Sequence, residues 1–364
     1  MQELNTVIDS PVVLGHAHMD DALERFLAGK KPSTAASYRC NFTKYFIPFL
    51  DTHEFLGAKF YTFREAVDAI KADNALPSNQ MTLLEDNFIN QFLDYLDIQI
   101  VNEKPLSKLS KRRVFAAVQS AMKKWKLSIS VKDYSVPQAN AETESYEWNL
   151  QDISIFNALL KHPEYRALDA YQFQSGLGLG DVIVRPYIDI KEAFEAFVFR
   201  NEEIIPCYKM TRGKTGVKHH NCIGPEAMML VKVMFDERYG ENGVPEPNDL
   251  IFPFKRERPI HDVYAARARD FLGSWPYSNP MGPHSKRKAF KTFLTKKGAK
   301  DEGLPSVIVE HYMGHKLKTI EQTYVAMQTS DWRQIYMEKC LPALHFDIIT
   351  TEEAVKLLKK RKAA

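Results

Sequence analysis

A polar stretch before the middle of the chain constrains the fold most strongly. Residues 133–147, DYSVPQANAETESYE, lack hydrophobic periodicity and contain a proline, which is typical of a linker. The chain has 364 residues, more than one ordinary hydrophobic core requires. We therefore predict two domains, at 18–132 and 148–345, with short tails at 1–17 and 346–364.

The predicted first domain is a bundle of amphipathic helices. Apolar residues recur at intervals of three and four in the segments 33–50, 62–72, 83–96 and 107–125. The first segment opens on Ser33, which we expect to cap the helix. The last segment brings basic side chains onto one outward stripe, so the bundle has one basic edge.

The predicted second domain mixes helices with short strands. Strand-like runs occur at 195–200 (EAFVFR), 203–210 (EIIPCYKM) and 217–223 (VKHHNCI). The glycine-containing loop TRGKTG joins the last two runs into a hairpin. A helix is expected over 224–240. The predicted fold class is mainly α, with two domains, the second of them α+β with a small antiparallel sheet.

Composition excludes several classes of protein. No apolar run reaches the roughly 18–20 residues that a membrane span needs. The N-terminal residues lack the basic and apolar regions of a signal peptide. The four cysteines are scattered without a C-x-x-C pair, so neither a zinc ribbon nor a disulfide framework is indicated. We expect a cytoplasmic protein that does not enter membranes.

Positive charge is segregated along the chain, although the net charge is only +3. The segments 104–126 and 284–300 and the final residues 356–364 are rich in Lys and Arg and contain no acid. A single such run is usually a solvated helix face. Three of them favour a surface that binds a polyanion such as nucleic acid.

Two histidines four residues apart, His311 and His315, have the spacing of a helical zinc pair. The glutamate that follows the first histidine in metalloproteases is absent here, and no third ligand lies nearby in the sequence. His219 and His220 are adjacent on a predicted strand, so they point to opposite faces. We therefore expect no metal site and a structural role for His311.

Residues upstream of His311 and His315 suggest a different interpretation of this part of the sequence. Along the chain come H-x-x-R (His284 and Arg287), then G-H (His315), then Tyr324 nine residues later. This order resembles the C-terminal signature of the tyrosine recombinases, the phage-integrase family. The K-T-G turn with Lys214 resembles the hairpin that carries the catalytic lysine of that family, and Lys209 and Lys218 on the same hairpin are competing candidates.

The resemblance extends over about residues 18–345. The N-terminal bundle is similar to the family's helical, SAM-like core-binding domain. Within the family, the sequence is similar to integrases from archaeal mobile elements. Residues 175–190, SGLGLGDVIVRPYIDI, resemble the family's first motif box. That box normally has an arginine where this chain has Gly178. Arg185 and Arg212 are two candidate substitutes for the missing arginine.

The family cuts and rejoins DNA through a 3′-phosphotyrosyl bond, without metal, ATP or another cofactor. The resemblance implies that Tyr324 is the nucleophile, Arg287 a phosphate clamp and Lys214 the general acid. It implies that His315 donates to the phosphate, and that His284 is the general base or a hydrogen-bonding partner. An active recombinase of a mobile element is our expectation, and topoisomerase-like relaxation is a lesser variant of the same chemistry.

The implied partner is double-stranded DNA at attachment sites, bound by a homo-oligomer that is a tetramer on DNA. The basic side chains expected to contact DNA are Lys108, Lys111, Arg112, Lys286 and Lys288. A tail helix at 351–362 is expected to dock on its own chain or on a neighbouring subunit. The alternative function is a catalytically inactive, architectural or regulatory DNA-binding protein of the same fold, which Gly178 supports.

Overall fold

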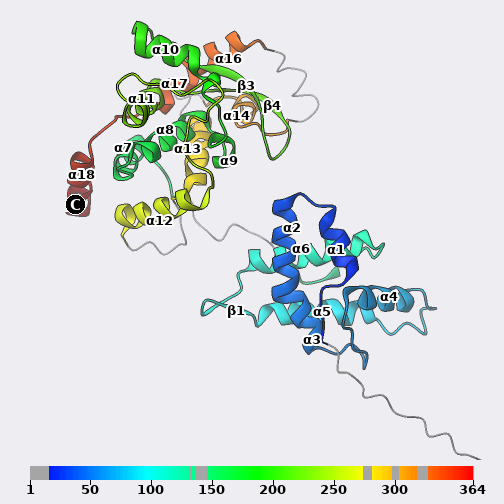
Figure 1. Ribbon diagram of the computed structural model, residues 1–364. Coiled ribbons are helices and arrows are strands. Elements are labelled where there is room, and N and C mark those ends of the chain that lie inside the picture. The colour runs from blue at the N-terminus through cyan, green and yellow to red at the C-terminus, as the bar shows by residue number, and fades with distance from the viewer. Residues whose placement is uncertain are drawn as a thin grey trace, which may run out of the picture. The chain divides into compact units, whose positions relative to one another are not determined.

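The computed structural model describes residues 16–130, 133–136, 146–273, 281–296, 303–317 and 327–363. The chain forms two compact units, Met1–Glu142 and Thr143–Ala364 (Figure 1). The boundary between them falls inside the aperiodic stretch 133–147. Each unit has its own hydrophobic core.

The first unit is a helical bundle with one short hairpin. Its elements are α1 (Asp21–Ala28), α2 (Pro32–Asn41), η1 (Phe42–Phe46), α3 (Ile47–Thr52), α4 (Phe63–Asn74), α5 (Leu84–Asp97), β1 (Ile100–Val101), β2 (Lys104–Pro105) and α6 (Lys108–Lys124). The four predicted helical segments are all helical. The expected cap at Ser33 is wrong, because Pro32 already occupies the first turn and Lys31 precedes it.

Phenylalanine side chains form the centre of this bundle. The ring of Phe46 lies within 6.5 Å, centroid to centroid, of five other rings, which belong to Phe42, Phe49, Phe63, Phe88 and Phe92. Most of these pairs meet edge to face, an arrangement that contributes about 0.5–1.5 kcal/mol per pair beyond burial. They join η1 and α3 to α4 and α5, so one aromatic cluster holds the bundle together.

The second unit contains helices and one antiparallel hairpin. Its elements are α7 (Leu150–Leu159), α8 (Pro163–Ser175), α9 (Leu179–Val182), η3 (Tyr187–Asp189), α10 (Lys191–Arg200), β3 (Cys207–Thr211), β4 (Lys218–Cys222), α11 (Pro225–Tyr239), α12 (Arg258–Leu272), α13 (Pro283–Lys296), α14 (Ser306–Tyr312), α16 (Thr329–Ile335), η5 (Tyr336–Cys340), α17 (Leu341–Leu344) and α18 (Thr351–Ala363). The predicted mainly α fold class with a small antiparallel sheet is confirmed.

The predicted strand at 195–200 is wrong, because these residues end helix α10. Ala193, Phe194 and Ala196 are buried at helical spacing, and Asn201 terminates the helix in the left-handed conformation. A short apolar run does not distinguish a strand from a buried helical segment, and here the residues before it extend the helical pattern.

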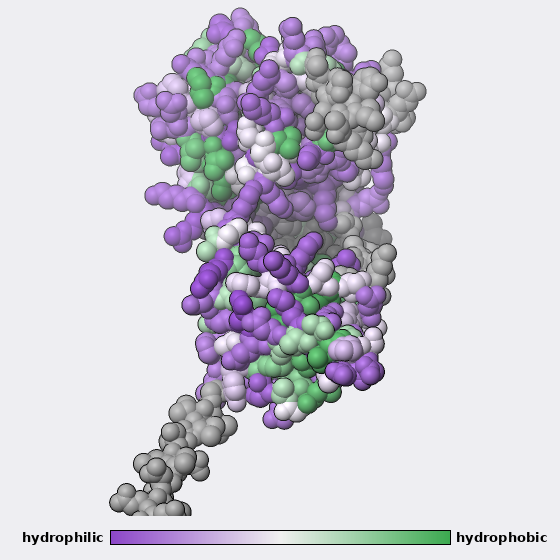
Figure 2. All heavy atoms as spheres, turned by 90° about the vertical axis from the view of Figure 1, so that its right-hand side faces the viewer, coloured by the Kyte–Doolittle hydropathy of each residue, from purple (hydrophilic) through white to green (hydrophobic). Residues whose placement is uncertain are grey.

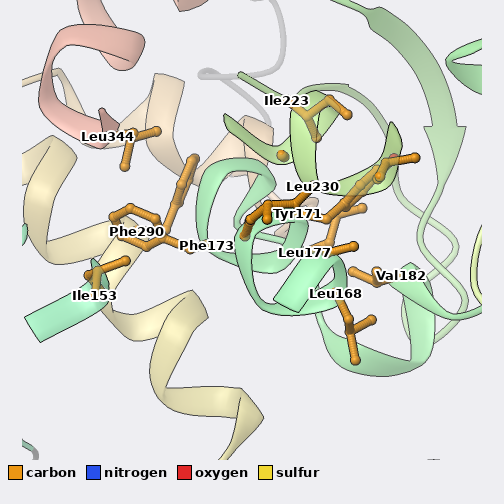
Figure 3. Packing of buried hydrophobic residues seen from close by; sticks show 14 of the residues in the cluster. Ile153, Leu168, Tyr171, Phe173, Leu177, Val182, Ile223, Leu230, Phe290 and Leu344 are labelled. Carbon is orange, nitrogen blue, oxygen red and sulfur yellow. The ribbon is translucent and has the colours of Figure 1, made fainter. Parts of the chain in front are cut away.

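Helix α8 lies at the centre of the second unit, and every residue from Ala167 to Ser175 is buried. Figure 3 shows side chains of α8, among them Tyr171 and Phe173, packed among apolar residues of neighbouring elements. Gly176 ends α8 with φ +65°, and a Cβ there would lie only 2.4 Å from the ring of Phe290 on α13. Glycine is therefore required where α8 and α13 meet.

The hairpin pairs β3 with β4 from Cys207↔Cys222 to Thr211↔Lys218, as the TRGKTG loop predicts. Arg212 closes the turn by donating its backbone N–H to Val217 O at 2.9 Å. Strand β4 is buried from His219 to Cys222 and packs against α14, so the base of the hairpin is fixed and its turn reaches outward.

The tail helix α18 forms as predicted and packs on α7 of its own chain. Ala354 and Leu358 are buried, and Arg361 pairs with the buried Asp152 at 2.7 Å. Polar side chains cover most of the face shown in Figure 2, with small apolar patches between them. In the part of the chain that the structure describes, no helix is long and apolar enough to span a membrane.

A stack of aromatic rings joins α14, β4 and α16. The rings of His311 and Trp332 are parallel, with centroids 3.9 Å apart. The backbone N–H of His220 donates to His311 Nε2 at 3.1 Å, so that nitrogen carries no proton. Burial, with the nearby His220 and His219, lowers the pKa of His311 to about 3. Burial likewise lowers the pKa of His219 to about 4.

We predict that these histidines make the fold sensitive to acid. In the unfolded chain a histidine takes up a proton near pH 6.5, whereas the folded chain keeps His219 and His311 neutral until the pH is much lower. Stability is therefore full above about pH 6.5 and falls towards pH 4, by up to about 1.4 kcal/mol per pH unit for each histidine. Urea unfolding of wild type and His311→Gln at pH 6.5, 5.5 and 4.5 measures this, and we expect a smaller decline in the variant.

The matched control is His162→Gln, since His162 is exposed. It should retain the decline of wild type. Equal declines for wild type and His311→Gln would show that burial of this histidine does not control the acid sensitivity.

Candidate active site

Helix α13 carries the H-x-x-R motif and begins at Pro283, directly before His284. His284 is exposed at the start of the helix, and Arg287, one turn later, is only 2% exposed. The start of α13 thus carries an exposed histidine and a buried arginine.

The guanidinium of Arg287 connects three segments. It donates to the carbonyl oxygen of Gly176 at the end of α8 and to that of Met313 at 2.7 Å. Its Nη2 also lies 2.8 Å from His315 Nε2. Burial, together with the charge of Arg212, lowers the pKa of Arg287 to about 10, so it remains cationic at neutral pH.

Glu310 orients His315 from the other side. Its carboxylate contacts His315 Nδ1 and accepts a hydrogen bond from Lys291 Nζ at 2.5 Å. Burial alone would raise the pKa of Glu310, but the hydrogen bonds from Lys291 and His315 hold it below its ordinary value. Sequence reasoning missed Glu310, because five residues is not a helical-face spacing. Gly314 turns the chain back at φ +62°, which places His315 over Glu310.

His311 and His315 do not form a chelating pair. His311 lies in the stack with Trp332, whereas His315 contacts Arg287 and Glu310. Within the described ranges, no group of His, Cys, Asp or Glu side chains could hold a metal ion. An open pocket of about 440 Å³ lies beside His315, between the hairpin turn and the end of α14, and Lys218 and Lys316 line it.

The hairpin turn presents Arg212 and Lys214 near these groups. The carboxylate of Asp181, on α9, accepts the backbone N–H of Gly213 at 2.9 Å and lies 3.7 Å from Arg212 Nε. Arg212 Nη1 donates to Gly314 O at 3.3 Å. Lys214 is exposed in the turn.

Positive charge converges on His284. Partial desolvation of the imidazole by its neighbours lowers its pKa, and so do the charges of Lys288, Arg287, Lys214 and Arg212, in that order. The structure thus brings together side chains of α13, the hairpin and the end of α14 that are far apart in the sequence. Tyr324, the predicted nucleophile, lies outside the described residues.

The two candidate substitute arginines occupy different places. Arg185 donates through Nε to Asp181 O at 2.9 Å and pairs with Asp189 at 3.4 Å. Its charge acts on the buried hydroxyls of Tyr171 and Tyr208. Arg212 instead contacts the residue before His315. Of the two, Arg212 is the one whose charge acts on Arg287 and His284.

The prediction that Lys286 contacts DNA is wrong. Its side chain is 0% exposed and pairs with the buried Asp169 at 3.2 Å. The ammonium also lies 4.1 Å from the ring centroid of Trp148. Helical spacing explains this, because Lys286 shares the core-facing side of α13 with Phe290 and Phe293. The adjacent Lys288 is exposed.

Three basic side chains predicted to contact DNA lie near the start of α6. Ser107 caps this helix by accepting the backbone N–H of Ser110. Lys108 and Arg112 are exposed, whereas Lys111 is largely buried and pairs with Asp97. Two of the three thus extend from the unit into solvent.

No protein-family model and no curated protein matches the chain. It is similar to a solved λ integrase dimer bound to a COC′ core site, with 14% identity, a TM-score of 0.48 and coverage of 83% of this chain and 93% of that one. It is also similar to XerH site-specific recombinase bound to difH substrate, with 14% identity, a TM-score of 0.48 and coverage of 86% and 83%.

A third similar structure is the Tn1549 transposon integrase in complex with circular intermediate DNA. Its identity to this chain is 13% and its TM-score 0.45, with coverage of 87% of this chain and 97% of that one. This likeness is one of fold. In fold, the chain resembles the recombinases and integrases that its H-x-x-R, G-H and K-T-G motifs indicate.

Proposed function

We propose that this chain is a site-specific tyrosine recombinase that cuts and rejoins DNA through a 3′-phosphotyrosyl intermediate. The observation that carries the proposal is the convergence of Arg287 and His315 with the hairpin turn that holds Lys214. These are the residues that the motif order assigns to one site, and they come from three separate segments.

Arg287 and His315 suit the stabilisation of a phosphorane. In this transition state negative charge grows on the equatorial phosphate oxygens, and a planar guanidinium binds two such oxygens while keeping its proton. Carbonyl oxygens hold the Arg287 guanidinium in place, and a preorganised donor of this kind stabilises the transition state more than the ground state. Glu310 fixes the His315 ring through Nδ1, while Nε2 accepts from Arg287. His315 therefore donates to the phosphate only after Nε2 has gained a proton and left Arg287.

The proposed reaction moves two protons. The hydroxyl oxygen of Tyr324 forms a bond to phosphorus, and its proton passes to a base, for which His284 is the candidate. The bond from phosphorus to the 5′-oxygen breaks, and Lys214 donates a proton to the leaving oxygen. Partial desolvation and four neighbouring cations lower the pKa of His284, so it is neutral and able to accept a proton at pH 7.

We also propose that the protein acts on attachment sites of a mobile element as a tetramer, because reciprocal recombination exchanges four strands. The alternative is an inactive DNA-binding protein of the same fold. Its support is that Gly178 stands where the family has an arginine. The adduct experiment below decides between the two.

We predict that Tyr324→Phe abolishes covalent capture of DNA. The probe is a pool of nicked duplexes with a randomised central region, in which cleavage beside the nick releases a short strand and traps the adduct. We expect wild type to yield an SDS-resistant adduct, with Tyr324 as the modified residue in mass spectrometry. Phenylalanine lacks the attacking oxygen, so the variant should bind DNA and give no adduct.

Tyr239→Phe is the control, since Tyr239 is exposed on α11, and it should leave the adduct yield unchanged. DNA binding by wild type without an adduct on any duplex would instead support the inactive DNA-binding protein.

We predict that Lys214→Ala slows cleavage of an ordinary phosphodiester but not of a duplex with sulfur in place of the 5′-bridging oxygen. A thiol, with a pKa of about 8.5, leaves without a proton donor, whereas an alkoxide does not. Single-turnover cleavage rates on the two duplexes, chosen from the captured pool, measure the difference. Equal defects on both would exclude Lys214 as the general acid.

We predict that Arg112→Gln weakens DNA binding and makes it less dependent on salt. Each phosphate contact contributes about 0.9 to the slope of log K against log salt concentration, so the slope should fall by about that amount. Fluorescence anisotropy of a labelled duplex across a salt series measures it. Lys71→Gln, an exposed lysine on α4, is the control and should retain the slope of wild type.

A further inference from the structure

We propose that Arg212 is the second phosphate clamp of this enzyme. It would replace the arginine of the family's first motif box, where this chain has Gly178. One hairpin then supplies both a phosphate clamp and the general acid. This inference rests on the proposed recombinase function. It concerns which side chain of this chain completes the site.

Arg212 lies beside two proposed members of the site, Arg287 and His315. Arg287 binds the carbonyl oxygen of Met313, and Arg212 binds that of the next residue, Gly314. Since consecutive carbonyl groups lie within a few ångströms of each other, the two guanidiniums flank the turn that carries His315. An anion held by Arg287 and His315 would therefore lie next to Arg212.

The charges around Arg212 leave room for an anion. Its side chain is 14% exposed, and its Nε has no hydrogen-bond partner within the described residues. The carboxylate of Asp181 forms a long ion pair with this Nε through Oδ2, at 3.7 Å, and accepts the backbone N–H of Gly213 through Oδ1. The charge of Arg212 also contributes to the lowered pKa of Arg287, so the two cations repel each other. A bound phosphate would relieve their repulsion.

The backbone conformation at position 178 does not require glycine. It precedes α9 with φ −71°, a conformation open to any residue. A Cβ at this position would meet only the Oδ2 atom of Asp181, at 3.5 Å, which is an ordinary contact. An arginine side chain at position 178 would therefore start beside the same carboxylate that now faces Arg212. The two positions are alternative places from which an arginine can reach one site.

The consequence is that catalysis depends on one docked hairpin. Asp181 holds the turn through Gly213 and lies beside Arg212. If the turn leaves α9, the clamp and Lys214 leave with it. A hairpin that supplies both groups makes the second clamp and the general acid available together.

The test measures single-turnover cleavage on a captured duplex, together with DNA affinity and thermal unfolding. Arg212→Gln should cleave about 10²–10³ times more slowly than wild type, as expected for loss of one preorganised donor. DNA affinity should change little, because the rest of the interface is intact. Arg200→Gln is the matched control, since Arg200 pairs with Glu202 on the surface of α10, and it should cleave like wild type.

The double variant Gly178→Arg with Arg212→Gln should cleave at least about tenfold faster than Arg212→Gln alone, because the new arginine starts beside Asp181 and can reach the same site. Sulfur at the 5′-bridging position should not restore Arg212→Gln, although it restores Lys214→Ala. That contrast separates a clamp from a proton donor.

Each result has a defined meaning. Absence of an adduct with wild type overturns the proposed function and this inference with it. An active wild type with an Arg212→Gln rate within about threefold of it leaves the function standing and overturns the role of Arg212. Rescue of Arg212→Gln by bridging sulfur, or no rescue by Gly178→Arg, also overturns the clamp assignment.

Discussion

The second unit depends on the hydrogen bonds of one buried guanidinium. Arg287 joins the end of α8, at Gly176, to the turn after α14, at Met313 and His315. Loss of this side chain would leave buried carbonyl groups without partners, a cost of about 1–3 kcal/mol for each. Glycine at position 176 allows α13 to approach closely enough for these bonds. The same contacts that stabilise the unit thus fix the position of the guanidinium that we propose binds a phosphate.

Helix α13 is fixed by charges on two of its faces. On one face Lys286 and Asp169 form a buried ion pair, with the ammonium against Trp148. On the other, Arg287 contacts the turn after α14, and the charges of the hairpin residues Arg212 and Lys214 act on His284. Because breaking a buried ion pair costs several kcal/mol, the Lys286–Asp169 pair resists rotation of the helix about its axis. A lysine that cannot reach DNA therefore helps to orient the arginine proposed to bind it.

Sequence patterns predicted the elements whose periodicity is long and regular. The segments that became α4, α5 and α6 were found because their apolar residues repeat at helical spacing. The segment that became α11 was found because Pro225 near its first turn and Gly240 at its end mark a helix. The short run at 195–200 was misassigned as a strand, because six residues are too few to distinguish the helical period from the strand period. The burial of Lys286 was missed for a related reason. A basic run looks like a solvated face until the opposite side of the helix is known to pack on the core.

The sequence by itself determined the order of the residues that we propose carry the chemistry: Lys214, then His284 and Arg287, then His315, then Tyr324. It left open whether Arg185 or Arg212 stands in for the arginine absent at Gly178. Only the tertiary structure distinguished them, because it placed Arg185 on Asp189 and Arg212 on the turn before His315. Spacing along a chain specifies contacts within one helix or hairpin. Contacts between α9, the hairpin and the end of α14 depend on how these elements pack.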